Sequence, residues 1–220
     1  MNYKKIIPDQ EIRFKILNFL RFIPDSLLIR IQYFIKLSRF PNLRNPKRFS
    51  EKIQIYKLKY RNPKITIATD KYRVREYVES KGLSGILNTL YFVGNVAEDI
   101  DYNALPEKFV IKTNNGSGTN ILCNDKNKLN INEANKKINT WLSRNFYVAG
   151  RGWSYKNIEP KVIVEEYLED KNQQNGVFDY KFLCFNGEPH YIVHDVNRYT
   201  DHVRNIYDNK WNFIDVYSVC

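Results

Sequence analysis

Residues 108–123 read KFVIKTNNGSGTNILC, and this stretch decides the fold more than any other part of the chain. Apolar and β-branched residues on both sides of its centre predict two strands, Phe109–Lys112 and Asn120–Cys123. Small polar residues between them predict a loop that returns from strand to strand. A P-loop or a Rossmann loop instead runs from a strand into a helix, and neither of those sequence patterns occurs here.

The residues of this loop have the chemistry of a phosphate site. Gly116 and Gly118 let backbone N–H groups approach a phosphate closely, and Ser117 adds a hydroxyl donor. Lys112, on the preceding strand, supplies a positive charge. The loop is therefore either a flap that closes over a nucleotide or an ordinary hairpin loop.

Two later predicted strands carry charged residues that favour the nucleotide interpretation. Residues 161–168 read KVIVEEYL, an apolar strand that ends in two carboxylates and can present its backbone to an adenine edge. Asp179 and Lys181 lie two positions apart on the next strand, so their side chains share one face of it. Each feature alone is also compatible with a half-exposed polar strand, but their combination with the glycine loop indicates a nucleotide site.

The order of predicted elements is helices first and then a β-rich half that contains one helix. This order indicates an α+β fold and not a regular βαβ alternation. The predicted helices cover two segments within residues 10–40, residues 50–60, residues 69–82 and a segment that begins at Asn132. The predicted strands cover residues 90–93, 109–112, 120–123, 161–168, 177–185, 189–197, 203–207 and 211–216, with a tight turn at Asn186-Gly187.

Composition limits the class of protein. The 220 residues are 43% hydrophobic and 15% aromatic, which excludes an intrinsically disordered chain. The formal charge of +11 is compatible with nucleotides, phosphates, acidic polymers, nucleic acid or an anionic membrane surface as partners. Three widely spaced cysteines without a CxxC pair predict a reducing compartment. With no signal peptide and no apolar run of about 20 residues, the sequence predicts a cytoplasmic protein.

Residues 10–40 predict a pair of short amphipathic helices. Asp9 is placed to cap the first helix, and Pro24 separates it from the second. Basic residues alternate with the apolar positions of both helices. Such a pair either lies on a membrane surface, here the inner face of the cell membrane, or packs on the domain behind it.

In combination these motifs resemble the ATP-grasp enzymes, and more narrowly the TupA-like ATP-grasp family of teichuronopeptide biosynthesis. The resemblance implies an ATP-grasp fold with an N-terminal helical region at residues 1–45, a first lobe at 46–105 and a nucleotide-binding lobe at 106–220. The stretches that carry it are NPKRFSEKIQ at residues 45–54, TDKYRVREYV at 69–78, the loop at 109–118, EEYL at 165–168, DYKF at 179–182 and CFNG at 184–187.

The resemblance also implies roles for individual residues. Lys112 and Lys181 are the expected catalytic residues, because both would contact the phosphates of ATP. Lys71 and Arg75 are four positions apart on a predicted helix, so they share one face of it. There they either bind an acidic acceptor or form ordinary ion pairs. Asp70, Lys71 and Arg75 are the expected substrate-binding residues. The expected nucleotide site consists of Lys112, Asn115, Gly116, Ser117, Gly118, Glu165, Glu166, Leu168, Asp179 and Lys181, with Glu165, Glu166 and Leu168 beside adenine and ribose.

The activity implied by the resemblance is an ATP-dependent carboxylate–amine ligase of cell-surface polysaccharide biosynthesis, acting on an acidic or saccharide substrate. A carboxylate takes the γ-phosphoryl group to form an acyl phosphate, from which an amine then displaces phosphate. Mg²⁺ is expected for the family because it neutralises charge on the transferring group. The family's metal ligands are a late Asp and a Glu-x-Asn pair, which residues 211–220 do not match. We therefore expect a C-terminally truncated member without metal ligands, whose activity is open.

Two other functions remain as alternatives, a glycosyltransferase of the same pathway and a non-catalytic nucleotide-binding module. Asp99-Ile100-Asp101 matches the DxD pattern of metal-dependent glycosyltransferases, but it lies in an acidic connector. Cys184, His190 and His194 are close in sequence, yet the two histidines are too far apart along a strand for one zinc ion. No nucleic-acid partner is expected, since the sequence has no RNP-like motif and no helix-turn-helix signature.

Overall fold

The computed structural model describes residues 7–169, 177–197 and 201–216. It confirms the α+β fold, with helices and antiparallel sheets in the same chain. The chain divides into two compact units, Met1–Tyr167 and Leu168–Cys220. This boundary differs from those expected after residues 45 and 105, and the three-part division remains a prediction.

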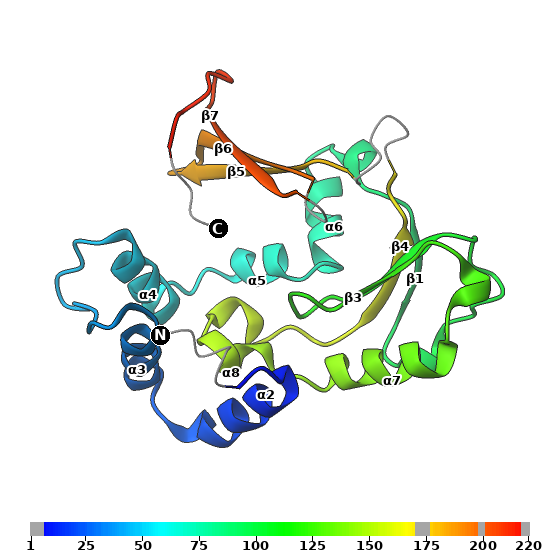
Figure 1. Cartoon of the computed structure of the whole chain (residues 1–220), viewed down its shortest axis with the longest axis horizontal. Helices are drawn as coiled ribbons and strands as arrows, with labels where there is room; N and C mark the ends of the chain where they lie inside the picture. The colour runs from blue at the N-terminus through cyan, green and yellow to red at the C-terminus, as the bar shows by residue number, and fades with distance from the viewer. Residues whose placement is uncertain (1–6, 170–176, 198–200, 217–220) are drawn as a thin grey trace. The chain divides into compact units, whose positions relative to one another are not determined.

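Figure 1 shows the elements in chain order from blue to red. The helices and 3₁₀ turns are α2 (Gln10–Phe19), η1 (Leu20–Phe22), α3 (Asp25–Leu37), α4 (Phe49–Lys59), α5 (Pro63–Thr69), α6 (Arg73–Glu79), η2 (Ser84–Ile86), η3 (Ala97–Asp99), η4 (Lys126–Lys128), α7 (Ile131–Leu142), α8 (Phe146–Gly150) and η5 (Trp153–Tyr155). The strands are β1 (Leu90–Gly94), β2 (Phe109–Thr113), β3 (Asn120–Cys123), β4 (Val162–Glu166), β5 (Asp179–Phe185), β6 (Glu188–Val196) and β7 (Val203–Asp208).

The first unit is built around a four-stranded sheet with the order β1-β4-β2-β3 and antiparallel pairing throughout. Alternate residues of each strand face opposite sides. Phe109 and Ile111 point into the hydrophobic core, where Ile138 of α7 packs against them. Lys112 and Glu165 lie on the opposite face of the sheet. Strand alternation therefore gives the sheet one apolar face toward the core and one face with charged side chains.

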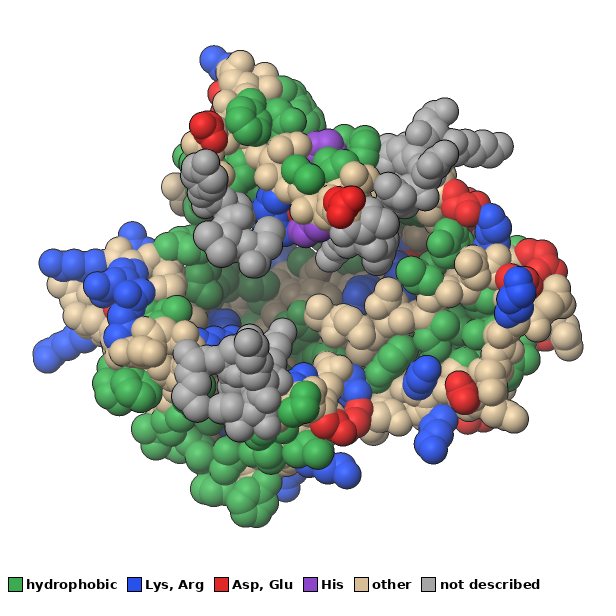
Figure 2. Space-filling model, viewed as in Figure 1, with side chains coloured by type: hydrophobic (Ala, Val, Ile, Leu, Met, Phe, Trp, Pro, Cys, Tyr) green, Lys and Arg blue, Asp and Glu red, His purple; other side chains and the backbone are tan. Residues whose placement is uncertain are grey.

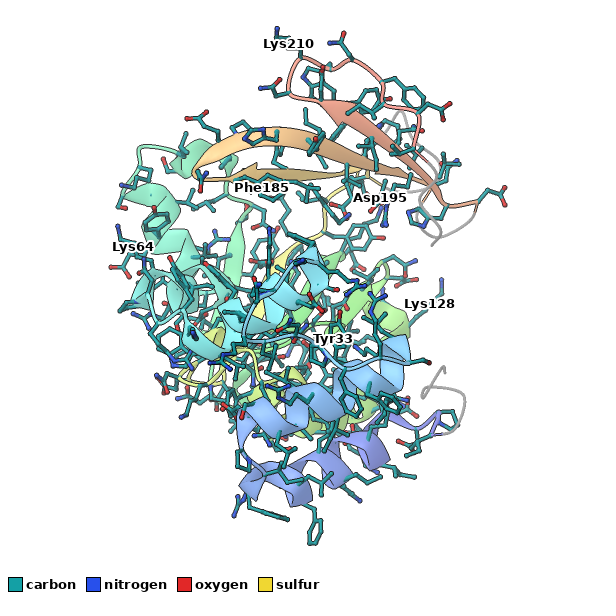
Figure 3. All side chains as sticks on the ribbon, turned by 90° about the vertical axis from the view of Figure 1, so that its left-hand side faces the viewer. Tyr33, Lys64, Lys128, Phe185, Asp195 and Lys210 are labelled. Carbon is teal, nitrogen blue, oxygen red and sulfur yellow. The ribbon has the colours of Figure 1, made fainter. Side chains whose placement is uncertain are left out.

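The two predicted N-terminal helices are confirmed as α2 and α3. Asp9 caps α2 by accepting hydrogen bonds from the backbone N–H groups of Glu11 and Ile12. The pair packs on the rest of the first unit: Gln32 donates to the carbonyl of Ala149 over 3.1 Å, and the hydroxyls of Tyr33 (labelled in Figure 3) and Ser50 lie 2.8 Å apart. None of the described helices is both long enough and apolar enough to cross a membrane.

The helix predicted over residues 69–82 is wrong in its first part. The structure ends α5 at Thr69 and begins α6 at Arg73. Asp70 interrupts the helix because its carboxylate accepts hydrogen bonds from the N–H groups of Tyr72 and Arg73, over 2.9 and 3.1 Å. Lys71 and Arg75 therefore do not lie on one helix face. The helix also ends earlier than predicted, at Glu79 and not at Gly82, although Gly82 has the left-handed φ of +73° that glycine adopts without strain.

Two other helix boundaries differ from the prediction. The helix expected to begin at Ser50 begins at Phe49, and its first turn is held by Glu51, whose buried carboxylate accepts backbone hydrogen bonds from Asn42, Lys47 and Arg48. The helix expected from Asn132 begins one residue earlier, with Asn130 as its cap. The side-chain oxygen of Asn130 accepts from the N–H of Glu133 over 3.2 Å, one of the N–H groups that the first turn leaves free.

The second unit is a three-stranded antiparallel sheet with the order β5-β6-β7. Its tight turn at Asn186-Gly187 is confirmed by positive φ angles at both residues. The strand predicted over residues 211–216 is wrong, because only a single bridge joins Phe213 to Tyr207. The carboxylate of Asp208 accepts from the N–H groups of Lys210 and Asn212, over 2.8 Å each, and bends the chain there.

Candidate functional site

An ion pair joins the two central strands of the first unit on the face opposite the core. Lys112 of β2 and Glu165 of β4 lie on neighbouring strands, and the ammonium group is 2.5 Å from a carboxylate oxygen. Glu165 is buried at 5% exposure, whereas the side chain of Lys112 keeps 30% exposure. The lysine is therefore the partner that a ligand can reach.

Arg75 of α6 completes the neutralisation of this carboxylate. Its guanidinium lies 3.3 Å from the second oxygen of Glu165. Asn88 fixes the guanidinium by accepting two hydrogen bonds, one on its side-chain oxygen over 2.9 Å and one on its backbone carbonyl over 2.6 Å. Because Asn88 holds Arg75 in place, Glu165 has a second cationic partner besides Lys112.

Lys71 connects this cluster to the glycine loop. Its ammonium group donates to the carbonyl of Thr113 over 2.9 Å and to the carbonyl of Gly116. Burial lowers the pKa of Lys71, and the positive charge of Lys112 lowers it further. An added anion would favour the charged form of Lys71, which burial and the neighbouring ammonium group of Lys112 disfavour. The described residues therefore fit a polyphosphate at this point.

The loop between β2 and β3 is closed at its base and open at its tip. Thr113 and Thr119 join across the base by a backbone hydrogen bond of 3.2 Å and a hydroxyl–hydroxyl contact of 2.8 Å. Ser117 and Gly118 at the tip are exposed, and Gly118 has a φ of +71°. The tip therefore offers a hydroxyl and backbone groups to solvent, as the sequence predicts for a phosphate-binding flap.

Gly116 is required for a reason that the sequence did not indicate. A Cβ at this position would lie 2.4 Å from the ring of Phe146 on α8, far inside van der Waals contact. The loop is therefore positioned by packing against α8. Phe146 is a residue that sequence analysis missed, because nothing local to residue 146 marks it as a neighbour of the loop.

Asn114 and Asp70 form a buried polar network beneath the loop. The side-chain amide of Asn114 donates to Asp70 over 3.0 Å and to the carbonyl of Glu159 over 2.9 Å. Its oxygen accepts from the N–H of Lys161 over 2.7 Å. Every hydrogen-bonding atom of this fully buried side chain is used, so the network ties α5, the loop and the start of β4 together. Asp70 has a structural place here, and its substrate-binding role remains a prediction.

Three other predicted site residues have different surroundings. Asn115 is buried and donates to the carbonyl of Arg144 over 3.4 Å, while its side-chain oxygen has no partner among the described residues. The carboxylate of Glu166 accepts from the N–H and the hydroxyl of Thr89, over 3.2 and 2.9 Å. Leu168 is exposed and is the first residue of the second unit. Within the first unit, the contacts of Asn115 and Glu166 lie outside the Lys112–Glu165 cluster.

The second unit contains a charge cluster of its own, centred on Asp195 (labelled in Figure 3). Lys181 donates to Asp179 over 2.6 Å, which confirms that they share a strand face, and also to Asp195. Arg204 contributes two hydrogen bonds to Asp195, over 2.6 and 3.1 Å, and His202 lies 3.0 Å from it. These contacts, that of Arg204 above all, hold the pKa of Asp195 far below its ordinary value.

No sequence motif marks Asp195 as the centre of this cluster. The strand register explains its position, because Asp195 lies directly opposite Asp179 on one side and Arg204 on the other. The hydrogen bonds that Lys181 donates to Asp179 and Asp195 also raise the pKa of Lys181, so its ammonium group stays charged over a wider pH range. Lys181 is 42% exposed and remains reachable by a ligand.

The described residues do not fit a metal held by the protein alone. No group of three or more His, Cys, Asp or Glu side chains is placed to bind a cation within residues 7–169, 177–197 and 201–216. Asp179 and Asp195 are already occupied by Lys181 and Arg204. His194 stacks on Tyr180 with ring centres 4.5 Å apart, away from any cysteine cluster. We therefore derive no step through a protein-bound magnesium ion.

Comparison with known proteins assigns the chain to a family. The family model TupA-like ATPgrasp matches residues 51–219, and the chain belongs to this ATP-grasp family. Members of the family bind ATP together with Mg²⁺, so the class of activity is ATP-dependent and ligase-type, with a nucleotide as substrate. No curated protein and no solved structure matches the chain.

Proposed function

We propose that the chain binds ATP at the Lys112–Glu165 cluster and works as a carboxylate–amine ligase, through an acyl phosphate, in cell-surface polysaccharide biosynthesis. The observation that carries this proposal is the convergence of Lys112 and Lys71 beside the open glycine loop, with a lowered pKa at Lys71. Burial and the nearby charge of Lys112 both disfavour the charged form of Lys71, and a bound polyphosphate would favour it.

In this proposal Lys112 releases Glu165 and turns to the phosphates. Arg75 remains on Glu165, so the buried carboxylate keeps a partner and the exchange leaves no isolated charge. Lys71 holds the carbonyl of Thr113 at the start of the loop and the carbonyl of Gly116 within it, and thereby sets the position of Ser117 and Gly118. Positioning and charge neutralisation are the main contributions that a protein makes to phosphoryl transfer.

The remaining assignments are parts of the same proposal. Lys181 and Asp179 contribute to nucleotide binding by family resemblance. The contacts of Lys71 and Arg75 within the first unit favour a positioning role over direct binding of an acidic or saccharide acceptor. The basic helices α2 and α3 suit a cytoplasmic protein that works at the inner face of the membrane.

Calorimetric titration with ATP, with and without Mg²⁺, tests the nucleotide site. Lys112→Ala is expected to weaken binding about tenfold or more, because hydrogen bonds to charged groups contribute about 1.5–3 kcal/mol. Lys161→Ala is the matched control: its side chain is similarly exposed at 25%, but its ammonium group contacts Asn95 and Glu159. Equal ATP affinity of the two variants would contradict the assignment of Lys112 to the ATP site.

Turnover and sugar-nucleotide binding separate the alternatives. A ligase releases ADP and phosphate only when both a carboxylate and an amine are present. ATP binding without such release, across a panel of carboxylates and amines, would favour the non-catalytic module. Binding of a labelled UDP-sugar without binding of ATP would favour the glycosyltransferase.

A further inference from the structure

A cavity of about 400 Å³ lies within the first unit, between helices α2, α3 and α4 and the end of α8. Its wall is mainly aliphatic, and several of its side chains are half exposed, among them Ile16, Ile31 and Ile35. Figure 2 shows hydrophobic side chains gathered over these N-terminal helices. The aliphatic residues that line the cavity are Ile7, Ile16, Leu17, Leu20, Leu28, Ile29, Ile31, Ile35 and Leu37.

Basic side chains also line this cavity. Arg13, Lys36 and Lys57 come from α2, α3 and α4, and none of the described residues that line the cavity is acidic. Lys57 donates to the carbonyl of Gly150 over 3.2 Å. Burial lowers the pKa of Lys57, and the charge of Lys36 lowers it further. The cavity therefore combines an apolar interior with basic side chains from three helices.

We propose that this cavity binds a single-chain amphipathic anion, with its alkyl chain among the aliphatic side chains and its carboxylate or phosphate head beside Lys36 and Lys57. The site is separate from the Lys112–Glu165 cluster and does not depend on the proposed ligase activity. Its residues Arg13, Lys36 and Lys57 are distinct from every residue assigned to ATP.

Size, polarity and charge each narrow the class of ligand. A volume of about 400 Å³ falls in the range of small-molecule sites, roughly 300–1,000 Å³. A small polar anion would leave the aliphatic wall unfilled, and a neutral alkane would make no favourable contact with the ammonium group of Lys57. A cationic amphiphile would be repelled by that ammonium group. An alkyl chain with an anionic head satisfies all three conditions.

Calorimetric titration with octyl, decyl and dodecyl phosphate, each below its micelle-forming concentration, tests the chain requirement. Each added methylene group is expected to tighten binding about fourfold until the cavity is full, and further lengthening then has no effect. Decyltrimethylammonium, with the same chain and a positive head, is expected not to bind. Equal binding of the cationic and anionic amphiphiles would overturn the proposal.

Two pairs of variants test the site itself. Lys57→Gln is expected to weaken decyl phosphate binding about tenfold, whereas Lys52→Gln, an exposed lysine on the same helix, leaves it unchanged. Ile35→Trp places an indole in the cavity from a half-exposed position, so it should abolish binding of decyl phosphate. The control Leu27→Trp is half exposed on the same helix but outside the cavity lining, so it should leave binding intact.

Melting curves establish that each variant is folded before its affinity is compared. ATP affinity is expected to be unchanged in all four variants, which separates a failure of this proposal from a failure of the ATP site. Vesicles containing phosphatidylglycerol distinguish a bilayer from a free amphiphile. Binding to such vesicles together with no binding of any monomeric alkyl phosphate would refute the cavity as the site.

Discussion

Replacing Gly116 by alanine tests whether the glycine loop is positioned by its contact with α8. The new Cβ would lie 2.4 Å from one atom of the Phe146 ring and 2.5 and 2.9 Å from two others. Carbon atoms in contact are normally about 3.5–4.0 Å apart, so the loop or the ring has to move by about 1 Å. The ring is itself held by an edge-on contact with Phe14 at 5.2 Å.

The size of the effect follows from two opposing contributions. Adding a methyl group to a packed site costs about 1–3 kcal/mol. Replacing glycine by alanine also reduces the entropy of the unfolded chain, which returns about 0.4–1 kcal/mol. We expect a net loss of about 1–2 kcal/mol, or a decrease in Tm of about 2–8 °C for a unit of this size.

Urea denaturation of a matched set of glycine variants measures this loss. Gly85→Ala is the control, because an added Cβ there meets no atom within 4 Å. Gly118→Ala separates steric from torsional strain: it has open space but a φ of +71°, which costs about 1 kcal/mol. Introducing Phe146→Leu should relieve the loss at Gly116 but not at Gly118. Equal losses at Gly116 with and without the ring would refute the packing argument.

Two further predictions concern the buried polar groups. Asn114→Ala removes the hydrogen-bond partner of Asp70, of the Glu159 carbonyl and of the Lys161 N–H. The free energy of unfolding measured by urea titration should therefore fall by about 3 kcal/mol. The control Asn127→Ala, at an exposed position, should change it by less than about 0.5 kcal/mol. Because the pKa of Asp195 is lowered in the folded state, its contribution is present above about pH 4 and is lost as the pH falls below that. Unfolding measured between pH 7 and pH 2 should therefore show a shallower loss of stability in Asp195→Asn than in the wild type; parallel curves would contradict the assignment.

The strands and tight turns were predictable because their signals are local. Alternation of apolar residues located β2 and β3 nearly to the residue, and Asn186-Gly187 located the β5–β6 turn. The positions that went wrong are those where one polar side chain captures backbone groups. Asp70 ends one helix and lets another begin three residues later, and Asp208 bends the chain where a strand was expected. Propensity averaged over a segment does not register a single capping interaction.

Sequence alone determined the family, the α+β order of the elements, and the position of Lys112 on the strand before the glycine loop. These features depend on the types and spacing of neighbouring residues. The tertiary structure alone decided which charges meet. Glu165 pairs with Lys112 and Arg75, and Arg75 is 90 residues away in the sequence. The strand register brings Lys181 and Arg204 to Asp195. Gly116 is likewise explained only by Phe146. Such contacts depend on packing between distant segments, which has no local signature in the chain.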